Sequence, residues 1–131
     1  MILQTRKTFS SYSADDMEKA EAFYKNTLGL QVTRAEMGVL ELHLIDGHTI
    51  IIYPKKNHQP ATFTVLNFVV EDIVSTVNQL SADGVHFLSY TGEIRTDERG
   101  IANADGTGPG PKIAWFADPA GNILSILEER V

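Results

Sequence analysis

Apolar residues recur at helical spacing in two segments of this chain, and each segment lies between strand-like runs. In the first segment the intervals are three and four residues: Met17, Ala20, Phe23, Tyr24 and Leu28. This spacing predicts an amphipathic helix that ends near Gly29. Ser13 is the expected N-cap, because Asp16 follows it by three residues in an acidic variant of the capping box.

The second helical segment repeats this pattern at Ile73, Val77 and Leu80, opens at Glu71-Asp72 and ends at Gly84. The strand-like runs are Lys7–Ser13, Leu30–Glu36, Val39–Asp46, His48–Tyr53, Phe63–Val70, Val85–Tyr90, Lys112–Phe116 and Asn122–Glu128. Strand, helix and three strands therefore occur twice, which predicts an α+β fold of two tandem βαβββ modules, about 1–58 and 61–131. We expect the pair to form a curved, cleft-bearing mixed sheet with helices outside. A ferredoxin-like sandwich is the alternative.

Residues rich in glycine, proline and polar side chains separate these elements. Asp46-Gly47 predicts a hairpin turn, and Pro54–Pro60 predicts a connector between the modules. The segment Thr91–Pro111 is too long for a simple connection, so we expect either a mobile lid or a disordered insertion.

The last two strand-like runs are joined by Asp118-Pro119-Ala120-Gly121, which follows the aromatic pair Trp115-Phe116. Together with the helix segment Asp16–Leu30, this closing hairpin resembles the vicinal oxygen chelate superfamily, which includes glyoxalase I, bleomycin-resistance proteins and extradiol dioxygenases. The similarity extends over nearly the whole chain in the same order. It implies one glyoxalase/bleomycin-resistance-like domain over residues 1–131.

The resemblance also implies where a metal would lie, because metal-binding members supply one ligand from each of four strands. Counted from the helix-opening and turn aspartates, three positions are Phe9, Val65 and Ser125; the fourth belongs on the last strand of the first module, near Ile51 or Ile52. A divalent cation needs nitrogen or oxygen donors, and only the serine has one, a poor ligand. We therefore expect no metal and no other cofactor, with Phe9, Ile52 and Val65 as apolar lining of the cleft.

Further pocket candidates follow from the alternation of residues along strands. Glu41 and His43 share one face of their strand, where they are either an acid–base pair or merely solvated. Ser11 and Asn67 are expected as polar groups in the apolar cleft. Trp115 could stack on a planar ligand, although aromatic strand residues also serve as core.

The composition limits the partners. A formal net charge of -6 without a basic block argues against nucleic acid and membrane surfaces. The absence of cysteine excludes thiolate chemistry and fits a cytoplasmic location. Superfamily members commonly dimerise, so we expect a homodimer.

These observations predict a metal-independent protein that binds a small organic molecule in an apolar cleft. One alternative is a metal-dependent lyase or dioxygenase of the same superfamily that uses displaced ligands, Glu41 and His43. A second alternative is a dimeric structural or interaction module that pairs its sheet edges with another chain.

Overall fold

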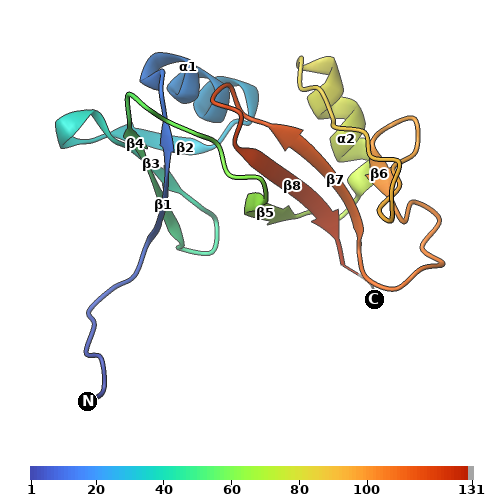
Figure 1. Ribbon diagram of the computed structural model, residues 1–131, viewed down its shortest axis with the longest axis horizontal. Helices are drawn as coiled ribbons and strands as arrows, with labels where there is room; N and C mark the ends of the chain where they lie inside the picture. The colour runs from blue at the N-terminus through green and yellow to red at the C-terminus, as the bar shows by residue number, and fades with distance from the viewer. Residues whose placement is uncertain (130–131) are drawn as a thin grey trace. The chain divides into compact units, whose positions relative to one another are not determined.

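The computed structural model describes residues 1–129 and has two compact units, Met1–Gln59 and the chain from Pro60 onward. The first unit is a four-stranded sheet of order β1-β4-β3-β2 with a helical segment beside it (Figure 1). Its elements are β1 (Ser10–Ala14), α1 (Met17–Ala22), a π-helical turn η1 (Phe23–Thr27), β2 (Gln31–Arg34), a 3-10 turn η2 (Glu36–Gly38), β3 (Leu40–His43) and β4 (Thr49–Pro54). The sheet is mixed, since β1 pairs with β4 in parallel and the other pairs are antiparallel.

Helix α1 begins later than the sequence predicts. Its N-cap is Asp16, whose carboxylate accepts a hydrogen bond from the backbone N–H of Lys19 at 3.1 Å. Ser13 still belongs to β1, and its hydroxyl lies 2.6 Å from Nδ1 of His58. The predicted Ser13 cap is therefore wrong, because Asp16 itself satisfies the orphan backbone donor of the first turn.

The core of the first unit lies between this sheet and the helical segment. The large aliphatic side chains of the sheet with at most 1% exposure are Leu40, Leu42, Ile50 and Ile52. Tyr24, on η1, is also fully buried, and its hydroxyl accepts a 2.8 Å hydrogen bond from the hydroxyl of Tyr12 on β1. Burial of each large aliphatic side chain contributes about 1.5–3 kcal/mol. One face of this sheet is therefore packed against the helical segment.

The second unit repeats the same order of elements. Its sheet has the order β5-β8-β7-β6, with β5 and β8 parallel. The elements are β5 (Thr64–Val69), α2 (Ile73–Ala82), β6 (Ile101–Ala102), β7 (Lys112–Ala117) and β8 (Ile123–Glu128). Asp72 caps α2 by accepting from the backbone N–H of Ser75 at 3.1 Å. The predicted α+β class with two βαβββ modules is confirmed.

The edge strand of the second sheet differs from the prediction. Val85–Tyr90 was expected as a strand, but it contributes only an isolated bridge between Phe87 and Phe116. At this edge of the sheet, β7 pairs with β6. Strand β6 lies inside the segment expected to be a lid or a disordered insertion. The apolar residues of Val85–Tyr90 pack against the core without forming a sheet ladder. Val85, for example, is 5% exposed.

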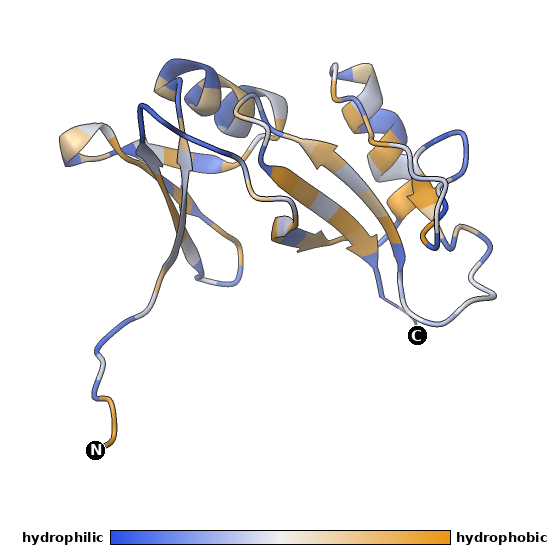
Figure 2. Ribbon diagram, viewed as in Figure 1, coloured by the Kyte–Doolittle hydropathy of each residue, from blue (hydrophilic) through white to orange (hydrophobic). Residues whose placement is uncertain are grey.

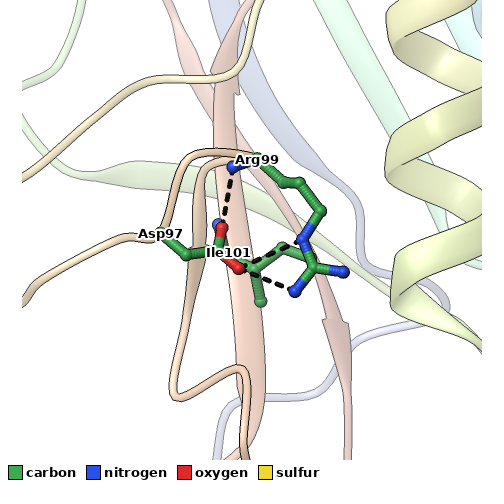
Figure 3. Close-up of polar contacts among 3 residues, drawn as sticks. All are labelled: Asp97, Arg99 and Ile101. Atoms are coloured by element: carbon green, nitrogen blue, oxygen red, sulfur yellow. Dashed lines mark hydrogen bonds and ion pairs between the residues drawn. The ribbon is translucent and has the colours of Figure 1, made fainter.

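The carboxylate of Asp97 holds the loop that precedes β6. Asp97 accepts hydrogen bonds from the backbone N–H groups of Arg99 and Ile101, each at 2.9 Å, and from the Arg99 guanidinium at 2.7 Å (Figure 3). Partial burial opposes ionisation, but the bonds from Ile101 and Arg99 outweigh it and lower the pKa of Asp97. These contacts bring Ile101 into the sheet.

The hydropathy of the chain follows this arrangement. Figure 2 shows apolar residues along β8 and β7, the two inner strands of the second sheet. The predicted turn at Asp46-Gly47 is confirmed, with Gly47 at φ +88° and its N–H bonded to the Leu44 carbonyl.

Among the helices of residues 1–129, none has the length and apolar character needed to cross a membrane.

Candidate functional site

The sheet of the second unit has one face packed under α2 and one face free of it. Strand pairing places Asn67, Ser125 and Trp115 in one row across β5, β8 and β7. The neighbouring row, one residue along, contains Leu66, Leu124 and Phe116, which are at most 7% exposed. Because alternate residues point to opposite faces, the row of Trp115 lies on the face away from this core. We call it the open face of the second sheet.

A cavity of about 280 Å³ lies on this open face. Its lining residues are Thr62, Phe63, Thr64, Tyr90, Ile94, Trp115 and Ile123. Three of them are aromatic, and the rings of Tyr90 and Trp115 meet edge to face at 83° with centroids 5.3 Å apart. The indole N–H of Trp115 donates to the hydroxyl of Thr64 at 3.1 Å, which fixes the ring against β5. Such a cavity suits a planar apolar group.

Next to the cavity, two polar side chains are paired. The Ser125 hydroxyl donates to the side-chain carbonyl of Asn67 at 2.5 Å. Ser125 is fully buried, whereas Asn67 is exposed on the open face. The pair therefore joins β5 to β8 and leaves a polar amide at the surface of an otherwise apolar region.

The sheet of the first unit also has an open face, which carries Glu41 and His43. They do not bond to each other, because the hydroxyl of Thr33 on β2 lies between them. It donates to the Glu41 carboxylate at 3.3 Å and lies 2.8 Å from Nε2 of His43. A hydroxyl has one hydrogen, so it accepts the Nε2–H of His43. The expected acid–base pair is thus a three-residue chain through Thr33.

The placement of Ile52 corrects the sequence-based lining of the cleft. Ile52 is fully buried on the helix-facing side, in register with Tyr12 and Leu40. Its neighbour Ile51 is in register with Ser11 and Glu41 and lies on the open face. Ile52 was assigned by spacing, and one residue of error exchanges the two faces of a strand.

The other predicted positions also differ in their surroundings. Phe9 precedes β1 and is 55% exposed, while Ser11 is exposed on the open face of the first sheet. Val65 is half-buried at a register shift between Thr64 and Leu66. Of the nine candidates, the structure brings Asn67, Trp115 and Ser125 together in one row.

The donor set does not fit a divalent cation. Phe9, Ile52 and Val65 have no donor atom, and the Ser125 hydroxyl is engaged with Asn67. Among residues 1–129, no group of three or more His, Cys, Asp or Glu side chains could hold a metal ion. No chemistry through a bound metal follows from these residues.

Sequence reasoning missed most of the cavity. Phe63, Tyr90 and Ile94 are exposed by 67%, 37% and 53%, and they line one cavity together, as contiguous exposed apolar side chains do at a binding surface. Tyr90 and Ile94 lie outside any strand, and no periodic pattern marks them. Their convergence on Trp115 depends on the fold of the loop that Asp97 organises.

A family model for the Glyoxalase/Bleomycin resistance protein/Dioxygenase superfamily matches residues 9–126. The matched segment spans most of the chain and includes both modules. The chain therefore belongs to this superfamily, and the expected resemblance is confirmed. A search of curated proteins gave no significant match.

Solved structures show the same fold at low sequence identity. A protein assigned to the glyoxalase family from Bacillus anthracis has a TM-score of 0.71 at 19% identity, covering 99% of this chain and 100% of its own. TnmS3, an antibiotic binding protein from Streptomyces sp. CB03234, has a TM-score of 0.67 at 18% identity, covering 98% and 100%. The fosfomycin resistance protein FosX from Listeria monocytogenes has a TM-score of 0.68 at 15% identity, covering 98% and 97%.

Proposed function

We propose that this protein binds a small planar organic molecule without a metal ion, in the cavity on the open face of the second sheet. The observation that carries the proposal is the convergence of Trp115, Tyr90 and Phe63 on a cavity of about 280 Å³. Aromatic rings in such a site bind by stacking and by burial of apolar area. The expected size of the ligand is two to three fused rings.

Residue chemistry and related proteins support binding rather than metal catalysis. The positions expected to hold a metal have three side chains without donors. TnmS3, which has the same fold, is described as an antibiotic binding protein, so this fold includes a protein that binds a small organic molecule. The enzyme alternative requires Glu41 and His43 to act together at a metal, whereas both side chains are hydrogen-bonded to the hydroxyl of Thr33.

Two further parts of the proposal concern where and how the protein works. The absence of cysteine is compatible with the reducing cytoplasm, which we propose as its location. We also propose a homodimer, since both sheets have two edge strands that a second copy could cover. Sedimentation at micromolar concentration tests the dimer, and a monomer there would contradict it.

The experiment is a titration with fluorene, a planar tricyclic hydrocarbon. Trp115 is the single tryptophan of the chain, so its fluorescence reports on the cavity directly. We expect saturable quenching in the wild-type protein. Calorimetry then compares Trp115→Ala, which removes one aromatic wall and should weaken binding at least tenfold.

The matched control is Val74→Ala, which trims an exposed apolar side chain on α2, outside the cavity. Its affinity for fluorene should equal that of the wild type within twofold. If Trp115→Ala binds fluorene as tightly as the control, the cavity is not the binding site. Absence of saturable binding in the wild type would also contradict the proposal.

A further inference from the structure

The amide of Asn67 is held in one orientation. The Ser125 hydroxyl donates to its carbonyl oxygen, so that oxygen faces β8. Ser125 is fully buried and is in register with Asn67 on one side and Trp115 on the other. The two N–H donors of the amide therefore turn away from Ser125, toward the exposed surface of the open face.

Asn67 does not itself line the aromatic cavity, but the register of β5 and β8 places it next to the end of the cavity at Ile123. Ile123 lines the cavity and precedes Ser125 by two residues on β8, on the same face. Two residues of a strand span about 7 Å. A ring system bound against Trp115 and Ile123 can therefore extend one edge to the amide of Asn67.

The charge of the chain favours an uncharged partner for this amide. With a formal net charge of -6, the protein repels anions at long range. The amide offers hydrogen bonds without a compensating positive charge, unlike arginine or lysine. A carbonyl oxygen satisfies both conditions, because it accepts hydrogen bonds and carries no net charge.

We propose that Asn67 is a specificity-determining residue that selects planar aromatic ligands bearing a carbonyl oxygen, and that Ser125 is the positioning residue that orients its amide. The inference rests on the proposed function of the cavity. It adds the polar half of the ligand to the apolar half that Trp115 and Tyr90 recognise.

The test compares two probes of the same shape, 9-fluorenone and fluorene, which differ by a carbonyl group in place of a methylene group. In the wild-type protein, we expect fluorenone to bind about threefold to tenfold more tightly, the effect of one net hydrogen bond. Equal affinity for the two probes would overturn the role of Asn67.

Two variants assign the preference to its residues. Asn67→Asp is isosteric and still accepts the bond from Ser125, but it presents a carboxylate oxygen where the amide nitrogen was. We expect the preference to reverse in favour of fluorene. Ser125→Ala leaves the amide free to rotate, so the preference for fluorenone over fluorene should fall by at least half. Circular dichroism checks that both variants fold.

The outcomes separate this inference from the proposed function. If both probes bind but Asn67→Asp keeps the preference for fluorenone, the specificity assignment is wrong and the cavity remains a binding site. If Ser125→Ala has the full wild-type preference, Ser125 does not position the amide. If neither probe binds to the wild-type protein, the proposed function itself fails.

Discussion

Both the backbone conformation of Gly100 and the side chains around it disfavour an added methyl group. Gly100→Ala is therefore the sharpest test of the packing described above. The residue has φ +90°, a left-handed conformation that strains L-amino acids with a side chain. A Cβ at this position would lie 2.8 Å from Cβ of Phe87 and 3.4 Å from the carbonyl oxygen of Leu88. Phe87 cannot move freely, since its ring packs against Phe116 with centroids 5.6 Å apart.

The expected loss of stability follows from these two terms. The left-handed conformation costs about 1–2 kcal/mol for a residue with a Cβ. Forced overpacking typically adds about 1–3 kcal/mol. Reduced entropy of the unfolded chain returns about 0.4–1 kcal/mol. The three terms together span about 1–4.5 kcal/mol, so we expect Gly100→Ala to lower the free energy of unfolding by about 3 kcal/mol.

The assay is urea unfolding followed by the fluorescence of Trp115, which reports on the unit that contains Gly100. A loss of this size lowers the midpoint by about 1–2 M for an ordinary urea dependence. The matched control is Gly92→Ala, because Gly92 has nothing within 4 Å of an added Cβ and no positive φ. The reasoning is refuted if both variants unfold within about 0.5 M of the wild type.

Two further predictions concern the carboxylates of the second unit. The lowered pKa of Asp97 means that its ionised form stabilises the folded state above its usual value of 3.8, and that this contribution disappears as the pH falls through the folded pKa. Asp97→Asn should therefore lower the urea midpoint at pH 7, and its difference from the wild type should shrink as the pH falls below 3.8; a constant difference from pH 7 downward would contradict this. Asp72→Ala removes the N-cap of α2 and should cost about 1 kcal/mol in urea unfolding. Asp72→Ser should restore most of this loss, and equal midpoints for the two variants would argue against the cap.

The periodic parts of the fold were predictable from sequence, whereas its long-range pairings were not. The spacing of apolar residues correctly indicated both helices, and Asp46-Gly47 correctly indicated a turn. The prediction of the second sheet's edge strand was wrong, because Val85–Tyr90 has the longer apolar run, whereas the two residues Ile101–Ala102 are too few to give a periodic signal. The choice between them depends on the hydrogen bonds that Asp97 makes, and these appear only when the loop is folded.

The candidate site was likewise predictable from the sequence only in part. Alternation along strands identified Asn67, Ser125 and Trp115 individually, but only the register of β5, β8 and β7 places them in one row. The sequence placed the fourth metal position near Ile51 or Ile52 without deciding between them, and the structure has Ile52 on the buried face and Ile51 on the open face. Tyr90 had no periodic signal, since it lies in an irregular segment and contacts Trp115 across 25 residues of sequence.

The central claim is binding of a planar organic ligand without a metal ion, and one calorimetric measurement tests it most directly. The affinity for 9-fluorenone is measured before and after exhaustive dialysis against a chelator. We expect the same dissociation constant in both preparations, because the aromatic rings of the cavity and the nearby amide of Asn67 bind the ligand without a metal ion. Loss of binding after dialysis, with recovery on addition of a divalent metal ion, would contradict the claim.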